Sequence, residues 1–194
     1  DQTYLTQVGT MEAGRMVREW KRPEQDKLVA RGYRIETLTH SMWMDALPEL
    51  HGLIDHIFGA NFAYSSLSFE SFAAKCGESF IRRACPHTSV MARGPEGDIA
   101  GFFLVYPHYG PLVTQAAGSE RLSSSTLSYE EHAPRLAEQD WRGCVAKTVG
   151  VAPAHRGEGV MNGLTVGIFD RGDGRYDPRE LSVRLQFGGN ALPE

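Results

Sequence analysis

The sequence has few cysteines, no long apolar run and no strong excess of charge. Its 194 residues include three cysteines, Cys76, Cys85 and Cys144, an odd number without close spacing. This argues against a disulfide framework and favours reduced, buried thiols. No apolar stretch approaches the roughly 18 residues that span a bilayer, and no signal-peptide pattern occurs. We therefore expect a soluble, cytoplasmic protein without a membrane partner.

The charge is small and scattered. The chain carries 20 basic and 24 acidic residues, and its formal net charge is −4. Because the basic residues form no stripe, we expect no nucleic-acid partner. The histidines show no metal-ligand spacing, and His51 and His56, which are five residues apart, do not share a helix face. No metal is therefore expected.

The first 32 residues contain one helical pattern. Apolar residues recur at helical spacing, and Pro23 predicts that the helix ends at about Lys21 or Arg22. We expect residues 1–32 to form an N-terminal helical extension and residues 33–194 to form the main domain. The residues that carry the helical pattern are Ala13, Met16, Val17 and Trp20.

The main domain is predicted to begin with a strand over residues 33–39, where apolar and polar residues alternate. Two helices should follow. The first has Asp45 at the N-cap position, Pro48 in its first turn and its end near Gly59. The second can be capped by Ser68, and its apolar face would consist of Phe69, Phe72, Ala73, Cys76 and Phe80.

Two β-rich runs, 88–92 and 99–106, are joined by the turn cluster RGPEGD and predict an antiparallel hairpin. Residues 110–140 read as a long loop with a short helix at 130–138. The remaining pattern predicts a strand, a glycine-rich crossing, a helix and a last strand, over 141–151, 152–159, 160–171 and 180–187. This order indicates an α+β fold around a mixed sheet.

The glycine-rich crossing is the most informative segment. A strand that leads through glycines into a helix presents unpaired backbone N–H groups where a phosphate can bind. Arg156 adds a positive charge, and Gly157 and Gly159 permit close approach of the backbone. The segment has neither the GK[ST] of a Walker A loop nor the GxGxxG of a dinucleotide site. Its residues therefore predict a phosphate-bearing ligand of another kind.

The crossing also resembles a known motif. The run V-x-V-x-P-x-x-R-G-x-G-V resembles the acyl-CoA-binding motif of the GNAT (GCN5-related N-acetyltransferase) family, and the order of elements upstream is similar as well. This resemblance implies a GNAT-like α+β fold, with a mixed, mostly antiparallel central sheet and helices on both faces. The residues of the run here are Val149, Val151, Pro153, Arg156, Gly157, Gly159 and Val160.

The resemblance implies acetyl-CoA or another acyl-CoA as co-substrate. The pantetheine arm would lie along the strand at Val149, Gly150 and Val151, and a backbone N–H of Val149 or Val151 would stabilise the thioester oxyanion. The pyrophosphate would lie on the N–H groups at the helix start. The residues implied there are Arg156, Gly157, Glu158, Gly159, Val160 and Met161.

Two features depart from the family pattern. Met161 stands where the family has Gly or Ala. The pattern also stops after the strand near Asn190, where the family adds a helix and further strands, so we expect a shortened C-terminal part. The proton-donating Tyr of that helix has no counterpart here. Because the chain opens at Asp1 and closes on GGNALPE, we expect an excised module or a processed chain.

The catalytic candidates are Tyr106 and His108, at the end of a predicted strand, and Thr148, on the motif strand. Each also has an ordinary interpretation: Tyr106 and His108 as surface residues, and Thr148 as a strand-packing residue. Acyl transfer needs a neutral nucleophile and a route for its proton. These residues are the ones that the pattern offers for that role.

Three functions remain open from the sequence. The first is acyl-CoA-dependent N-acetyl transfer to a small-molecule amine by direct attack. The second is a GNAT-like malonyl-CoA decarboxylase or S-acyltransferase that loads an acyl carrier protein in a biosynthetic assembly line, with Thr148 and His108 polarising the malonyl group. The third is a non-catalytic acyl-CoA-binding module. The loops at 59–68 and 107–140 would form the acceptor surface, and they carry no recognisable motif.

Overall fold

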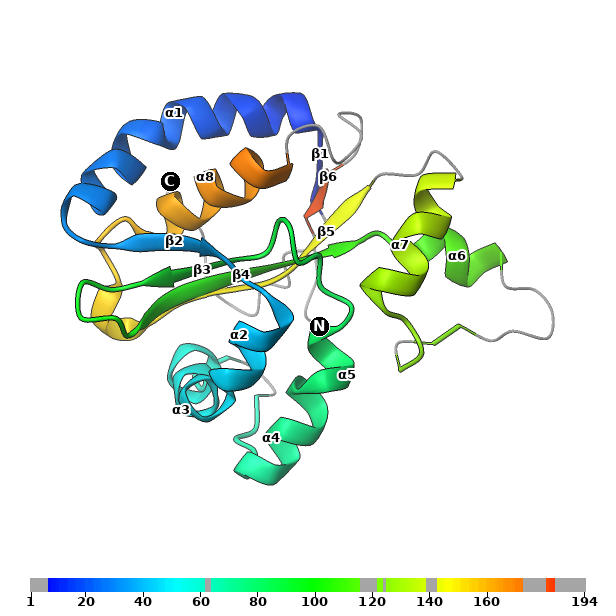
Figure 1. Cartoon of the computed structure of the whole chain (residues 1–194). Coiled ribbons are helices and arrows are strands. Elements are labelled where there is room, and N and C mark those ends of the chain that lie inside the picture. The colour runs from blue at the N-terminus through cyan, green and yellow to red at the C-terminus, as the bar shows by residue number, and fades with distance from the viewer. Residues whose placement is uncertain are drawn as a thin grey trace.

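A computed structural model shows a mixed β-sheet between two layers of helices (Figure 1). It describes residues 7–61, 64–115, 122–123, 125–138, 143–172 and 181–183. Within these residues the strands lie in the order β1-β6-β5-β4-β3-β2. Only β5 and β6 pair in parallel, and all other neighbours are antiparallel. The predicted α+β class, with a mostly antiparallel sheet and helices on both faces, is confirmed.

The bounds of the elements follow. The strands are β1 (Gln7–Gly9), β2 (Arg34–Thr37), β3 (Val90–Arg93), β4 (Ile99–Pro107), β5 (Cys144–Val151) and β6 (Leu181–Val183). The helices are α1 (Met11–Ala30), α2 (His40–Asp45), α3 (Leu47–Phe58), α4 (Phe69–Cys76), α5 (Glu78–Ile81), α6 (Gly110–Gln115), α7 (Tyr129–Glu138) and α8 (Val160–Gly172), with the 3₁₀ turn η1 (Pro153–His155) between β5 and α8.

Two apolar cores lie on the two faces of the sheet. The strand β4 is buried along its whole length and supplies both of them. Its residues Phe102, Leu104 and Tyr106 pack with α2–α5, whereas Phe103 and Val105 pack with α1 and α8. Figure 1 shows α1 beside α8 on one face, α2–α5 on the other, and α6 and α7 near one end of the sheet. The glycine crossing lies at the opposite end.

The helix α1 does not end before Pro23. It begins after Thr10, whose Oγ1 accepts a hydrogen bond from the Ala13 N–H at 3.1 Å, and continues to Ala30. A proline inside a helix removes one hydrogen bond and crowds the preceding turn. The second half of α1 is nevertheless packed on α8, where Leu28 is fully buried. The predicted end near Lys21 or Arg22 is therefore wrong, because tertiary packing beyond the proline outweighs its local effect.

Four described helices, rather than the predicted two, lie between β2 and β3. The short helix α2 was not predicted, although Thr39 caps it by accepting a hydrogen bond from the Met42 N–H at 3.2 Å. Asp45 is the last residue of α2 and not an N-cap. The following helix, α3, starts after Ala46, which makes no side-chain cap, and has Pro48 in its first turn as predicted.

The second predicted helix is divided in two. Ser68 caps α4 as predicted, since its Oγ accepts a hydrogen bond from the Ser71 N–H at 3.3 Å. Gly77 then separates α4 from α5, so Phe80 belongs to a different helix from Phe72. The predicted continuous apolar face is wrong, because the chain turns at this glycine to bring α5 onto the sheet.

Most of the remaining elements agree with the prediction in the described residues. The hairpin of β3 and β4 and the helices α7 and α8 are confirmed, while β1 and α6 were not predicted. Of the strands predicted over 141–151 and 180–187, residues 141–142, 180 and 184–187 lie outside the described residues. The strands found there are β5 and β6.

Candidate functional site

The strand β5 is held along one edge by β4 and contains a β-bulge. Leu104 of β4 lies opposite Thr148, and the next residue, Val105, lies opposite Ala146, so Lys147 is an extra residue without a partner on β4. Such a bulge locally changes which face each side chain takes. Thr148 consequently lies on the α3 face with Leu104, although Ala146, two residues earlier, lies on the α8 face.

The other edge of β5 is largely unpaired in the described residues. There β6 pairs only with Cys144 and Val145. From Ala146 to Val151 this edge carries no described strand. The described residues therefore leave the backbone N–H and C=O groups of this edge unpaired, and an extended ligand binds such an edge by adding a strand.

The crossing that follows β5 is shaped by two glycines with left-handed backbones. Gly157 has φ = 83° and Gly159 has φ = 84°. A side chain would be strained at either position. No atom lies within 4 Å of where a Cβ would stand at either glycine, so the space beside them is open.

Five backbone N–H groups of this segment donate no hydrogen bond to the residues that the structure describes. The first hydrogen bond into α8 is donated by Gly163 to the Gly159 carbonyl at 3.1 Å. Within the described part of the chain, the N–H groups before it that donate no hydrogen bond are those of Gly157, Gly159, Val160, Met161 and Asn162. We call these five groups, together with the Arg156 side chain, the anion cradle. Free N–H groups at a helix start favour a bound phosphate.

The charges around the anion cradle suit an anion. Arg156 is exposed and forms no ion pair with the described residues. The Glu158 carboxylate is paired with Arg31, which also donates to the Glu158 backbone carbonyl. Met161, the departure from the family pattern, is 43% exposed, so much of its side chain is in contact with solvent. The acidic residue in the crossing is thus neutralised while the basic one stays available.

A chain of three side chains supports the turn before the anion cradle. His155 of η1 contacts the Asp98 carboxylate through Nε2 at 2.7 Å and the Tyr33 hydroxyl through Nδ1 at 3.0 Å. The Tyr33 hydroxyl can donate or accept, so the chain persists whether His155 is neutral or charged. It links the start of β2 and the β3–β4 turn to the strand end at Ala152.

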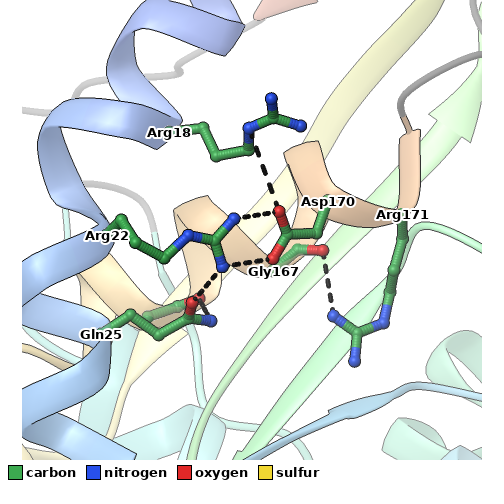
Figure 2. A network of polar contacts seen from close by, with 7 residues as sticks. Arg18, Arg22, Gln25, Gly167, Asp170 and Arg171 are labelled. Carbon is green, nitrogen blue, oxygen red and sulfur yellow. Dashed lines mark hydrogen bonds and ion pairs between the residues drawn. The ribbon is translucent and has the colours of Figure 1, made fainter.

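The C-terminal end of α8 is held on two sides, and Figure 2 shows the contacts with α1. Arg22 of α1 donates two hydrogen bonds to the Asp170 carboxylate, one of them at 2.7 Å, and Arg18 lies 4.0 Å from the same carboxylate. On the sheet side, Arg171 donates to the Thr37 hydroxyl at 2.8 Å and to the Ile35 carbonyl at 3.0 Å. These contacts hold the helix that carries the anion cradle against both α1 and β2.

Of the predicted catalytic residues, Tyr106 is buried in the core on the α2–α5 face of the sheet. Its side chain is 7% exposed and packs against Phe80. Its hydroxyl donates to the Phe80 carbonyl at 3.0 Å, and burial raises the pKa of Tyr106 well above its usual value. A phenol with these partners is poorly placed to exchange protons with a substrate.

The structure does not bring His108 and Thr148 together. His108 follows β4, and its backbone N–H donates to the Gly143 carbonyl at 2.8 Å. Thr148 lies beyond the bulge on β5, about 13 Å further along the strand at about 3.3 Å per residue. Thr148 is partly exposed on the α3 face, near the open edge, whereas His108 lies close to the end of the sheet that α6 and α7 approach.

The described residues contain no group of three or more His, Cys, Asp or Glu side chains arranged to hold a metal ion. None of their helices combines the length and the apolar character that crossing a membrane requires.

Several solved structures are similar to this chain. The C-terminal domain (DUF2156) of a putative lysylphosphatidylglycerol synthetase from Agrobacterium fabrum aligns over 94% of the chain with a TM-score of 0.52 and 11% identity. The protein L-PGS from Bacillus licheniformis aligns over 98% with a TM-score of 0.51 and 13% identity. A GCN5-related N-acetyltransferase from Sphaerobacter thermophilus aligns over 84% with a TM-score of 0.46 and 16% identity.

The chain has a GNAT-like fold. The order of strand, helices, hairpin, motif strand, crossing, helix and last strand is the one that the motif implied, and it forms the expected mixed sheet. The chain spans 46%, 48% and 38% of these three structures, less than half of each. At such low identity the likeness concerns the fold. No model of a known protein family matches the sequence, and no curated protein matches it.

Sequence reasoning missed several residues around the anion cradle. Arg31, Tyr33 and Asp98 reach it from 57 to 127 positions away in the sequence. None of them stands in a motif of its own, because their role depends on how the β-hairpin and α1 pack. Asn162, with a free N–H, was missed for a simpler reason, since the family pattern ends one residue earlier. Counting unpaired N–H groups through the first turn of the helix would have included it.

Proposed function

We propose that this chain binds an acyl-CoA and transfers its acyl group to an amine, most simply an acetyl group. The observation that carries the proposal is the anion cradle. It combines five N–H groups that donate no hydrogen bond to the described residues, two left-handed glycines, and Arg156, which forms no ion pair with those residues. A diphosphate offers several oxygens to such a set of donors, and the helix dipole of α8 favours its negative charge.

The open edge of β5 supports the same proposal. In our proposal, the pantetheine arm extends from the anion cradle along Val151, Gly150 and Val149 and pairs with the free backbone groups of this edge. The thioester would then lie near the bulge at Lys147. A backbone N–H of Val149 or Val151 would stabilise the oxyanion that forms when the amine attacks.

Thr148 is the catalytic candidate that best fits this geometry. It is partly exposed on the α3 face, beside the proposed thioester position. We propose that its hydroxyl contacts the acyl group. His108 and Tyr106 lie toward the other end of β5, away from this thioester position. The decarboxylase alternative would need Thr148 and His108 at one substrate, and the strand register does not support that pairing.

Calorimetry with acetyl-CoA tests the binding step. The wild-type chain is expected to bind acetyl-CoA, and Gly157→Trp to lose binding, because an indole at a left-handed glycine would fill the anion cradle. Gly52→Trp is the matched control: Gly52 is exposed on α3, no atom lies within 4 Å of its Cβ position, and binding should be unchanged. Failure of the wild-type chain to bind any CoA thioester would reject the proposal.

Turnover separates the enzyme from a binding module. Release of free CoA from acetyl-CoA should depend on an added acceptor, and the panel of acceptors contains small amines and acyl carrier proteins. The proposal expects release with an amine. Tight binding without turnover across the panel would leave a non-catalytic acyl-CoA-binding module. Acetyl-CoA formation from malonyl-CoA without an amine would favour the decarboxylase instead.

A further inference from the structure

Arg31 contacts the crossing at two points from outside the motif. One of its Nη atoms donates to the Glu158 carboxylate and the other donates to the Glu158 backbone carbonyl. The two residues are 127 positions apart in the sequence. Arg31 follows directly after α1, so this contact joins the end of the N-terminal helix to the middle of the anion cradle.

The contact with the carbonyl fixes the direction of one cradle N–H. A trans peptide is planar, and its C=O and N–H point in opposite directions. Because the Glu158 carbonyl points toward Arg31, the Gly159 N–H points away from Arg31. The peptide next to a glycine is otherwise easy to rotate. The Arg31 guanidinium therefore fixes the orientation of the peptide between Glu158 and Gly159, which the glycine backbone alone would leave variable.

The contact with the carboxylate removes a charge that opposes anion binding. Glu158 lies among the free N–H groups and is partly exposed. An unpaired carboxylate at that point would repel a phosphate. With Arg31 paired to it, the local charge near the backbone donors is close to zero and Arg156 supplies the net positive charge.

The base from which Arg31 extends is rigid. Along α1, Arg22 binds the Asp170 carboxylate (Figure 2). Gln25 contacts the Gly163 carbonyl at 3.5 Å, and Leu28 is fully buried. Beyond Arg31, the Tyr33 ring lies 5.7 Å from the guanidinium, and its hydroxyl is bound to His155. Arg31 is therefore held between two anchored segments.

We infer that Arg31 is a positioning residue of the anion cradle, which turns the Gly159 N–H toward a bound diphosphate and cancels the charge of Glu158 without touching the ligand. The inference rests on the proposed function. It makes the junction of α1 and β2 part of the cofactor site, although no residue of that junction belongs to the motif.

Two ligands distinguish this role from a general structural one. Arg31→Ala is expected to weaken acetyl-CoA binding about tenfold, the equivalent of about 1.4 kcal/mol. It should leave the KM for S-acetylpantetheine, a thioester without phosphates, unchanged. Lys27→Ala removes the same charge one turn earlier on α1, where Lys27 pairs with Glu24, and should change neither value. Equal losses for both ligands would show that Arg31 only stabilises the fold and would overturn the inference.

A second background tests whether Arg31 acts through the charge of Glu158. In Glu158→Gln the carboxylate charge is gone, so Arg31→Ala should weaken acetyl-CoA binding less than it does in the wild-type chain. An undiminished penalty would mean that Arg31 does not act by cancelling the Glu158 charge, which contradicts the inference. Arg31→Lys can reach only one of the two acceptors and should be intermediate. A wild-type chain that binds no CoA would instead reject the proposed function, whatever the variants do.

Discussion

The three cysteines differ in how far their thiols are buried. All are free, as the sequence predicted, but Cys76 is partly exposed whereas Cys85 and Cys144 are buried. Burial raises the pKa of Cys144 to about 12, with a smaller contribution from Cys85, and burial also raises the pKa of Cys76. The thiolate is the reactive form of cysteine.

Iodoacetamide should therefore modify Cys76 first, and more slowly than a free cysteine. Cys144 should react only after unfolding, because its thiol stays protonated and inaccessible at neutral pH. Peptide mass spectrometry over a time course, with a denatured sample as the control, measures both rates. Similar rates for Cys76 and Cys144 in the folded protein would contradict the burial described here.

Asp55 fixes the loop after α3. Its carboxylate accepts hydrogen bonds from the hydroxyls of Ser66 and Tyr64, which lower the pKa of Asp55 below its usual 3.8. Burial and the bond to Asp55 raise the pKa of Tyr64 to about 12. The stability that Asp55 contributes is thus present above pH 3.8 and is lost as the pH falls through the lowered pKa. The contribution of Tyr64 is present below its usual pKa and is lost as the pH rises through about 12.

We expect Asp55→Asn to lower the urea midpoint at pH 7, with a difference from the wild-type chain that shrinks as the pH falls below 3.8. The cause is protonation of the Asp55 carboxylate in the wild-type chain, which removes the same interaction. Urea titrations followed by circular dichroism at several pH values measure this difference. Asp45→Asn, at the end of α2, serves as the control. A difference that stays constant down to the lowest pH would contradict the assigned hydrogen bonds.

Single residues show how far the site could be predicted. Gly157, Gly159 and Arg156 stand in a contiguous motif. The preference of glycine for a left-handed backbone is a local property, so the sequence alone indicates it. Arg31 and Asp98 have no local signature, because each is ordinary until the chain folds. The role of Tyr106 was uncertain for the same reason: a tyrosine at a strand end can face solvent or the core, and only the packing of α5 decides.

Among the elements, α1 offers a direct test of packing against local preference. Pro23 lies within the helix and is exposed. Pro23→Ala should restore a helical hydrogen bond and raise the free energy of unfolding by about 2 kcal/mol, since an interior proline costs about 3 kcal/mol and rigidity of the unfolded chain offsets part of this. Urea unfolding measures the change.

Pro48→Ala provides the matched comparison, because Pro48 is in the first turn of α3, where no hydrogen bond is lost. It should be neutral or slightly destabilising. Destabilisation by Pro23→Ala would show that the proline is required for the course of α1.

The predicted elements were reliable where one periodic pattern ran without interruption. The helix α8 and the β3–β4 hairpin are of this kind, because apolar period and turn residues agree there. Short elements were missed. The strand β1 has three residues and owes its existence to pairing with β6, which lies far along the chain. The break at Gly77 likewise reflects the sheet beneath α5 and not the local sequence.

The two cores share one sheet, which links the two faces of the protein. Leu164 is fully buried on the α8 face, and Trp43 is 1% exposed on the α2–α5 face. Leu164→Ala should lower the free energy of unfolding by about 2–5 kcal/mol through lost burial and a residual cavity. Since β4 supplies both cores, this loss should destabilise both faces together.

Fluorescence of Trp43 can follow that coupling, with Trp20 and Trp141 replaced by Phe in both proteins compared. Leu164→Ala should move the urea transition of Trp43 to lower concentration by the same amount as the circular dichroism transition. Leu50→Ala, on the Trp43 face, should produce a shift of similar size. A Trp43 transition whose urea midpoint is unchanged by Leu164→Ala would mean that the two faces unfold separately.

The bulge at Lys147 shifts the alternation of side chains between the two faces of β5 by one residue. Downstream of it, every side chain takes the face that its neighbour would otherwise have taken, so Val149 and Val151 reach the α8 core and Thr148 reaches the α3 face. A strand one residue shorter would exchange these assignments and bury the hydroxyl among the aliphatic side chains. A substitution on this edge therefore changes one side chain. An insertion or deletion before Thr148 would instead move every following side chain of β5 to the opposite face of the sheet.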